Sequence, residues 1–328
     1  MRPLTINTLK ALRAAYAYLF SVTKHEPECI QDPDMAGEII YQQLMSDQPC
    51  MIARYGSYEM WIMLNYLGVK RGPRPIWKYI KGEELDWWWH KRFVEDEKPR
   101  VRTGYSFSIK MFEQFSEIMI NDSNYVDILG SWLHGETYFE KELQNCKKVY
   151  FEFLNPYFSK TPWTKALENK KILVVSALSR SVASQYQKRE LLFENKDILP
   201  PFELKVYQAV FEKKNSPYDT WFEALEGMQR DIDKIDYDIC LLGCGHFGFP
   251  LAAHIKRSGK KAVHLGGSIQ LLFGIRGKRW EDPNYQNKLS TNFAPIINYS
   301  KLMNEHWVRP LQDETPALAN KIEGGCYW

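Results

Sequence analysis

Residues 236–267, DYDICLLGCGHFGFPLAAHIKRSGKKAVHLGG, carry the clearest fold signal in the chain. An apolar run over 239–242 leads into the turn Gly243-Cys244-Gly245-His246-Phe247-Gly248, which has the spacing G-x-G-x-x-G. A helical segment over 249–258 and a short apolar run over 261–265 follow. A buried strand, a glycine turn, a helix and a second strand are typical of a parallel α/β unit.

The same alternation extends towards both termini. Further strands are predicted within CMIARYG (50–56) and YVDILGSW (125–132), and over 148–154, 171–176 and 204–211. Helices are predicted over 6–20, 34–45 with Asp34 as N-cap, 57–67, 179–191 and 217–232, and an aromatic helix is predicted around Trp87-Trp88-Trp89. Near-continuous apolar strands alternating with helices indicate an α/β, Rossmann-like fold with a mainly parallel sheet flanked by helices.

Composition and length limit the class of protein. With 328 residues, 45% hydrophobic and 25% charged, the chain is globular, and its net charge of +3 argues against a nucleic-acid partner. Six scattered cysteines without a C-x-x-C pair indicate free thiols in a reducing compartment, and no segment approaches the ~18 apolar residues of a membrane span. We therefore expect a cytoplasmic protein, with association at the inner face of the membrane left open. The oligomeric state is also open.

Three regions are predicted along the chain. Residues 1–33 form a helical extension, 34–280 form the Rossmann-like catalytic domain, and 281–328 form a tail packed on that domain. Within the domain, 34–155 is the metal and acceptor half and 156–280 is the nucleotide-binding half.

The glycine turn is suited to a phosphate group, because glycines let the backbone approach an anion at a helix N-terminus. A dinucleotide site also needs an acidic residue at the end of the next strand, but that strand ends in His264, Gly266, Gly267 and Ser268. This counts against NAD and favours a nucleotide diphosphate, while a turn needed only for packing stays open. The candidate ligand contacts here are Gly243, Gly245, Phe247, Gly248, His264, Gly266 and Gly267, with His246 as an acid/base candidate.

Three other motifs follow predicted strands or turns. ARYGSYE offers Arg54, Gly56, Ser57 and Glu59; SALSRS offers Ser176, Arg180 and Ser181; GIRGKRW offers Arg276, Lys278 and Arg279 beside Trp280. Arginine and helix N-termini bind phosphate, and a carboxylate can hold a divalent cation. The competing readings are an acid stabilising a helix start, serine capping and a solvated basic turn. For the three tryptophans, core packing competes with an acceptor or membrane surface. No G-x-S-x-G, Walker A, H-E-x-x-H or kinase motif is present.

Together, ARYGSYE, KILVVSALSRS, the segment 236–267 and LLFGIRGKRW resemble bacterial glycosyltransferases of the GT-D fold, the surface and capsular polysaccharide biosynthesis type, and related domains of unknown function. The resemblance spans about 34–280. It implies one Rossmann-like domain that binds a nucleotide-sugar, with a UDP-sugar favoured, and a Mn²⁺ or Mg²⁺ ion held by an Asp-x-Glu pair within Arg-Phe-Gly-Asp-Gly-Glu. Arg54, Tyr55, Gly56 and Glu59 match that motif, whereas Ser57 replaces the aspartate and Tyr58 the second glycine.

The resulting expectation is a hexosyltransferase that transfers a sugar to a glycan or lipid-linked acceptor in surface polysaccharide biosynthesis. Glu59 and His246 are the catalytic candidates, and Glu59 is also the one metal ligand, so the cation requirement is in doubt. The N-terminal helix and the tryptophans are expected to bring the enzyme to a membrane-bound acceptor. The alternatives are a non-catalytic nucleotide- or sugar-binding protein derived from a transferase and, less favoured, an NAD-type oxidoreductase.

Overall fold

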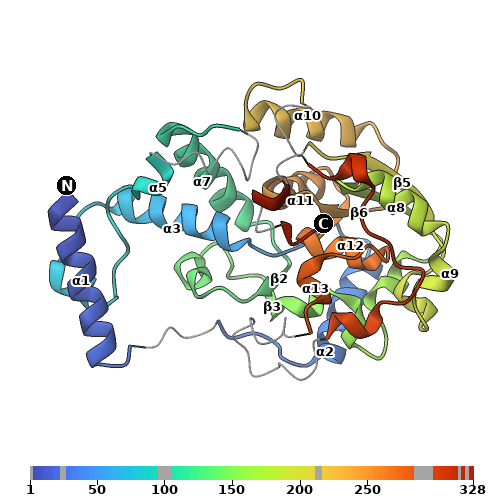
Figure 1. The fold of residues 1–328 in the computed structure, drawn as a ribbon, viewed down its shortest axis with the longest axis horizontal. Coiled ribbons are helices and arrows are strands. Elements are labelled where there is room, and N and C mark those ends of the chain that lie inside the picture. The colour runs from blue at the N-terminus through green and yellow to red at the C-terminus, as the bar shows by residue number, and fades with distance from the viewer. Residues whose placement is uncertain are drawn as a thin grey trace.

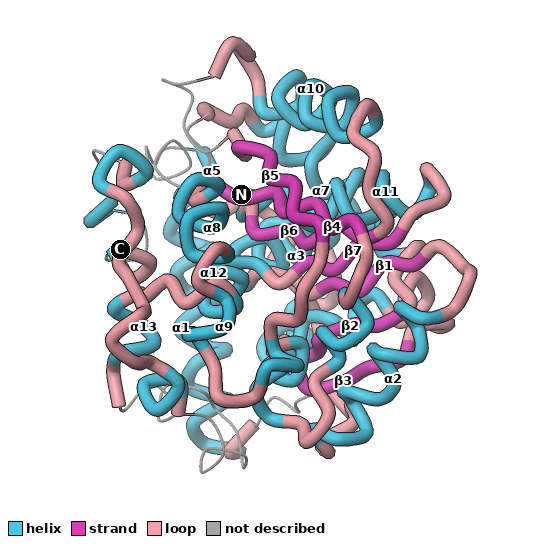
Figure 2. The backbone as a smooth tube through the Cα atoms, turned by 90° about the vertical axis from the view of Figure 1, so that its right-hand side faces the viewer, coloured by secondary structure: helices cyan, strands magenta, loops and turns pink. Residues whose placement is uncertain are grey.

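A single seven-stranded sheet forms the centre of the computed structural model, which describes residues 3–22, 27–94, 105–210, 216–283, 298–316, 319–321 and 325–328. The strand order is β3-β2-β1-β7-β6-β4-β5, and all neighbouring strands run parallel. Helices lie on both sides of the strands (Figure 2). The prediction of an α/β, Rossmann-like fold with a parallel sheet is confirmed.

The strands are short and most are buried along their length. They are β1 (Cys50–Ala53), β2 (Ile128–Ser131), β3 (Lys147–Tyr150), β4 (Lys171–Ser176), β5 (Glu203–Gln208), β6 (Ile239–Gly243) and β7 (Lys261–His264). Residue 211, the predicted end of the fifth strand, lies outside the described residues.

The main helices are α1 (Pro3–Leu19), α2 (Pro33–Met45), α3 (Ser57–Arg71), α7 (Ile109–Ser123), α8 (Ser179–Tyr186), α10 (Trp221–Asp233) and α11 (Gly248–Arg257). Shorter ones are α4 (Ile76–Ile80), α5 (Lys91–Val94), α9 (Arg189–Leu192), α12 (Ile269–Leu272) and α13 (Lys278–Glu281). Figure 1 shows α1 at one end of the molecule, away from the strands.

Alternate residues of each central strand pack into two separate cores. In β4, Ile172 and Val174 join a core with α2, α8 and α12, whereas Leu173 and Val175 join a core with α3, α7, α10 and α11. Burial on both faces explains why the strands have apolar residues at every position rather than at every second one.

The two cores also show where the chain diverges at the carboxyl edge of the sheet. After β1 and β6 the chain continues into α3 and α11 on one face, whereas after β7, which lies between them, it continues into α12 on the other. In open α/β sheets ligands bind at strand ends where the chain diverges in this way, and we call this edge between β1, β7 and β6 the crevice.

The prediction that Asp34 caps the second helix is wrong by two residues. Asp32 is the N-cap and its Oδ1 accepts from the Met35 amide at 2.8 Å, with Pro33 in the first turn, where its missing N–H is tolerated. Asp34 instead accepts from the Lys160 amide at 2.7 Å.

The prediction of a helix around Trp87-Trp88-Trp89 is also wrong, because this segment is a loop. Asn65 of α3 holds its backbone: Asn65 Nδ2 donates to the Trp88 carbonyl at 2.9 Å, and Asn65 Oδ1 accepts from the His90 amide at 3.1 Å. These tertiary bonds use backbone groups that a helix would need. Trp88 is buried against Leu9 and Tyr79, so core packing applies to it rather than a membrane surface.

Two predicted elements are interrupted. The strand expected over 148–154 ends at Tyr150, because its partner β2 ends at the paired Ser131, and residues Phe151–Leu154 form a 3₁₀ turn. The helix expected over 179–191 is divided into α8 and α9, with a break at residues 187 and 188.

The division of the chain into three regions stays a prediction. The two predicted halves of the domain, 34–155 and 156–280, both contribute strands to the same sheet. Within the described tail, Val308 forms a parallel bridge with Ile275. All six cysteines are free. Among the described helices, none combines the length and apolar character that crossing a membrane requires.

Candidate functional site

Two glycine turns meet at the carboxyl ends of β6 and β7. A Cβ on Gly243 would lie 3.0 Å from the carbonyl oxygen of Gly266 and would collide with Ile269, so the two turns approach as closely as backbone allows. Gly245 and Gly266 have φ of 57° and 64°, a region that L side chains rarely adopt. The glycines predicted from G-x-G-x-x-G and HLGG are therefore required by the local backbone.

Arg54 follows β1 and reaches the second turn. A Cβ on Gly266 would lie 2.7 Å from Arg54 Nη2, and the guanidinium carbon is 5.7 Å from the centroid of the Phe151 ring. Among the residues that the structure describes, no carboxylate lies within ion-pair distance of Arg54. Its charge is thus available to an anion at the crevice.

Glu59 and His246 face each other across the crevice. Glu59 Oε1 lies 3.8 Å from His246 Nε2, and each side chain is 14% exposed. Glu59 lies in the first turn of α3, where its carboxylate folds over Gly56 so closely that a Cβ there would collide with it. His246 lies in the 3₁₀ turn Gly245–Phe247, with the Tyr58 ring edge-on at 5.7 Å between centroids. The Glu59 carboxylate, a hydrogen-bond acceptor, and the His246 imidazole, which carries a proton, are thus close enough to contact the same small ligand group.

His264 is buried beneath the crevice rather than lining it. Its ring packs against Gly248, and Nδ1 lies 3.3 Å from the Leu242 carbonyl oxygen. Burial, reinforced by the nearby Arg54 guanidinium, lowers the pKa of His264 to about 3. The imidazole is therefore neutral at physiological pH and its Nδ1 is placed to donate to β6.

A small recess open to solvent adjoins Arg54 on the α12 side of β7. It is lined by Arg54, Phe151, Glu152, Leu154, Asn155, Leu265, Gly267, Ser268, Arg279 and Trp280. On one wall, Asn155 Nδ2 donates to Glu152 Oε2 at 3.0 Å, and the Tyr299 hydroxyl donates to the same oxygen. The recess thus has two arginine side chains in its wall, which suit an anionic ligand, whereas Phe151, Glu152 and Trp280 are buried.

The basic motif near residue 278 is divided among three environments. Arg279 lines the recess and donates to the Tyr327 hydroxyl at 3.3 Å, while Lys278 is exposed. Arg276 is bonded to the tail, since its Nη2 donates to the Asn304 carbonyl at 2.6 Å.

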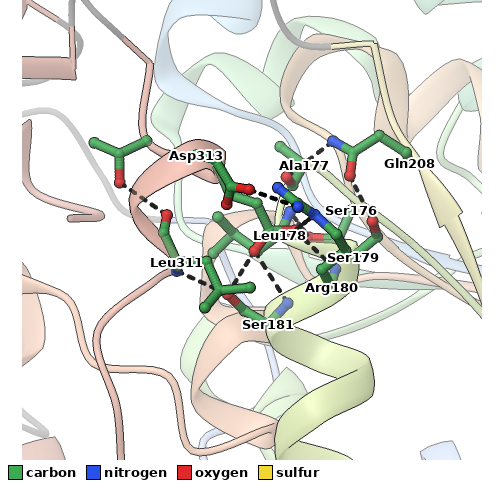
Figure 3. Close-up of polar contacts among 11 residues, drawn as sticks. Ser176, Ala177, Leu178, Ser179, Arg180, Ser181, Gln208, Leu311 and Asp313 are labelled. Atoms are coloured by element: carbon green, nitrogen blue, oxygen red, sulfur yellow. Dashed lines mark hydrogen bonds and ion pairs between the residues drawn. The ribbon is translucent and has the colours of Figure 1, made fainter.

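The serine and arginine motif after β4 is filled by the tail. Glu314 accepts from the amides of Arg180 at 2.7 Å and Ser181 at 3.0 Å, and from the Ser181 hydroxyl at 2.5 Å. The Arg180 guanidinium pairs with Asp313 at 2.6 Å, and the Leu311 amide donates to Ser181 Oγ, as Figure 3 shows. The N-terminus of α8 is thus an anion site as predicted from its residue types, but its anion is a carboxylate of the same chain.

Ser176 lies further inside the same loop. It is buried, and its Oγ accepts from the Leu178 amide at 3.1 Å. Ser57, in contrast, is exposed at the start of α3.

The residues around Glu59 fit a protein-held divalent cation poorly. Ser57 supplies no carboxylate, and the neighbour of Glu59 is an imidazole rather than a second acid. Among the described residues, no group of three or more His, Cys, Asp and Glu side chains could hold a metal ion. Mg²⁺ and Mn²⁺ prefer oxygen ligands, so we derive no chemical step through a metal here.

Several residues of this region were not predicted from the sequence. Phe151, Glu152 and Asn155 lay in a segment interpreted as a strand and loop, and Glu314 lay in a tail with no pattern. The one available signal was that Glu152 and Asn155 directly follow an apolar run.

Comparisons with known proteins add little. No protein-family model matches the chain, and no curated protein matches it. A solved structure described as a selenomethionine-substituted domain of unknown function 1792 (DUF1792) is 14% identical, with a TM-score of 0.33, covering 79% of this chain and 82% of that one. A TM-score this low supports no conclusion about this chain.

Proposed function

We propose that the protein is a nucleotide-sugar-dependent glycosyltransferase that transfers a sugar to a glycan or lipid-linked acceptor in surface polysaccharide biosynthesis. The observation that supports this most is that the Glu59–His246 pair, Arg54 and the two glycine turns all follow the carboxyl ends of the neighbouring strands β1, β7 and β6. The GT-D resemblance of the motifs ARYGSYE and HLGG points the same way.

The donor, with a UDP-sugar favoured, would bind through its diphosphate. The amides of Gly245 and His246 open the 3₁₀ turn and would face the anion, whereas the Phe247 and Gly248 amides donate to the Cys244 and Gly245 carbonyls. Arg54 and Arg279 would neutralise the charge that develops on the leaving diphosphate. The buried Phe151 and Trp280 rings form part of the recess wall, against which a base or a sugar ring would pack.

The transfer itself needs a base for the acceptor hydroxyl. Glu59, or His246 in its neutral form, would take that proton as the acceptor oxygen forms a bond to the anomeric carbon. The bond from that carbon to the diphosphate oxygen breaks, and the electron pair leaves with the diphosphate. Whichever residue is not the base would hold the other in place across their 3.8 Å separation.

Ligand binding is the first test. Thermal-shift assays would use nucleoside diphosphates, their sugars, NAD and NADH, each with and without Mn²⁺, since a ligand that binds the folded state raises Tm. A nucleotide-sugar or diphosphate that raises Tm where NAD does not would support the proposal. Stabilisation by NAD or NADH alone would replace it with the oxidoreductase reading.

Turnover is the second test, measured as release of nucleoside diphosphate in the presence of glycan acceptors. We expect Glu59→Gln to bind the donor but to lose turnover, while Glu168→Gln, an exposed glutamate elsewhere, keeps both. The outcome that would favour a non-catalytic binding protein has two parts. Both variants bind the donor as the wild type does, and neither they nor the wild type release nucleoside diphosphate when an acceptor is added.

A further inference from the structure

Helix α1 has its apolar side facing outwards. The residues Leu4, Thr8, Ala11, Leu12, Ala15, Tyr18 and Leu19 recur at the spacing of one helix face, and all are exposed. Leu4 is 80% exposed, Leu19 73% and Tyr18 86%. Thr8, the single polar member, uses its hydroxyl to donate to the Leu4 carbonyl at 2.9 Å. We call this set the outer face of α1.

The opposite side of α1 is fixed to the protein. Leu9 packs with Tyr79 and Trp88 in a small core. Arg13 donates to the Glu84 carbonyl at 3.1 Å and lies 4.7 Å from the centroid of the Tyr79 ring. Contacts on the inner side of α1 therefore determine which way the outer face points. The apolar residues of the outer face are exposed, so packing within the described part of the chain does not explain why they are apolar.

The element under α1 adds cations and exposed aromatic surface. Helix α4, which packs against α1, exposes Ile76 and Trp77 at 56% and 57%. The basic segment around it contains Lys70, Arg71, Arg74, Lys78 and Lys81 and has no acidic residue between positions 60 and 82. Lys70 and Lys81 pair with Glu117 and Glu83, whereas among the described residues no carboxylate lies within ion-pair distance of Arg74 or Lys78.

Charge is strongly concentrated in these two segments. Residues 1–25 contain four cations and no acid, and residues 60–82 contain five cations and no acid. Since the whole chain has a net charge of +3, these nine cations leave a net charge of −6 on the remainder. Among the described residues, this end of the molecule has seven of these cations, Lys10, Arg13 and the five of the second segment, and also the acids Glu83, Glu84 and Asp86, of which Asp86 pairs with Arg13 and Glu83 with Lys81. The cations still exceed the acids here, so an anionic surface is attracted to this end.

We propose that the outer face of α1, together with Trp77 and the basic segment, docks the protein on an anionic lipid bilayer. A helix with one apolar face lies in the plane of a membrane interface, tryptophan favours the headgroup level, and nearby lysine and arginine bind anionic lipid. The tryptophan that meets the lipid is Trp77 rather than Trp88. The proposal is independent of the transfer reaction.

Vesicle co-sedimentation of the full chain tests this. The vesicles would be phosphatidylcholine alone or phosphatidylcholine mixed with phosphatidylglycerol, at low and high salt. We expect binding to the mixed vesicles only, weakened by salt. Arg74→Gln with Lys78→Gln should lower the affinity roughly 10- to 30-fold, because each cation near the surface contributes about fivefold. Leu4→Gln with Leu19→Gln should lower it at least tenfold.

Met35→Gln with Leu311→Gln is the matched control, since these apolar side chains are also exposed but lie outside both segments. All variants must keep the wild-type Tm, as expected for exposed positions. Equal vesicle binding by all three variants would overturn the proposal, and so would absence of binding to the mixed vesicles. Self-association that is abolished by Leu4→Gln with Leu19→Gln, without vesicle binding, would assign the outer face to a second copy of the chain.

Discussion

Helices α3 and α8 begin at the same edge of the sheet, and both starts have the residue types of an anion site. At α8 the amides of Arg180 and Ser181 are bound by Glu314, a residue more than 130 positions further along the chain. At α3 the N-cap is Gly56, which has no side-chain cap, and the nearby Glu59 faces His246 instead. One helix start is thus completed by the protein itself, and the other keeps its polar groups at the crevice.

This difference separates two uses of the same local chemistry. A buried carboxylate bound by three donors stabilises a fold, because removing it would leave donors without partners. A partly exposed acid and imidazole that face each other contribute little to the core and are suited to a ligand. Substitutions at the two helix starts and around the crevice can test whether the division holds, from the largest expected effect to the smallest.

Glu59→Gln and His246→Gln should each lower the rate of sugar transfer by roughly 10²–10⁴-fold, the usual contribution of a general base and its partner. Thermal unfolding should change little, because neither side chain is fully buried. Steady-state kinetics and Tm measure the two effects.

The double variant distinguishes a working pair from two independent contacts. If the residues act together, Glu59→Gln with His246→Gln loses little more activity than the worse single variant. Fully multiplied losses would contradict the pairing across the crevice.

Glu314→Ala should destabilise the protein by about 2–3 kcal/mol, since two amides and one hydroxyl lose a buried acceptor. Urea unfolding measures this free energy. Asp313→Asn is the control: it alters the exposed partner of Arg180, and surface ion pairs contribute little.

Acetate added to Glu314→Ala should restore part of the lost stability if the helix start remains an anion site. Binding of nucleoside diphosphates should be unchanged below the unfolding temperature. A selective loss of that binding would show that the α8 start belongs to the ligand site after all.

Gly266→Ala should weaken binding of a nucleoside diphosphate by about five- to tenfold, because the new methyl group would lie 2.7 Å from Arg54 Nη2 and displace an ionic hydrogen bond. Isothermal titration calorimetry measures the change. Gly259→Ala is a close control, since Gly259 also has a positive φ, 82°, but nothing lies within 4 Å of the added carbon. Both variants should lose about 1 kcal/mol of stability, and an equal loss of affinity in both would remove the role of Arg54.

Acid should destabilise the protein partly through His264. Its pKa is near 3 when folded and near its usual 6.5 when unfolded, so only the unfolded state takes up a proton between those values. Stability from this group is complete above pH 6.5 and falls by about 1 kcal/mol as pH drops to 5.5. Between pH 6.5 and 5.5 the free energy of unfolding should fall by about 1 kcal/mol more in the wild type than in His264→Gln. An equal fall in both proteins would contradict this prediction.

Local sequence was sufficient for most of the fold. Lys171–Ser176 begins and ends where its apolar run predicts, because burial on both faces makes every position apolar. The tryptophan loop was missed because its conformation depends on Asn65, and no local pattern records that partner.

The same limit applies to the site. Arg54, Glu59 and His246 could be proposed because each follows a strand or starts a helix, and parallel strands bring such positions to one edge. Glu314 could not be proposed, because only the three-dimensional path of the tail brings it to the N-terminus of α8. Glu152 was missed since the end of its strand depends on where β2 stops pairing.

The central place of β7 also has a consequence for synthesis on the ribosome. Strand β1 pairs with β7 through Cys50 and Lys261, and β7 also separates β1 from β6. At about 5–20 residues per second, roughly 10–40 s pass between the synthesis of these partners. During that interval the strands β1–β3 and β4–β6 have unpaired edges, which are sites for aggregation. Insertion of β7 joins the two groups, so we expect the crevice and the completed sheet to form in the same late step.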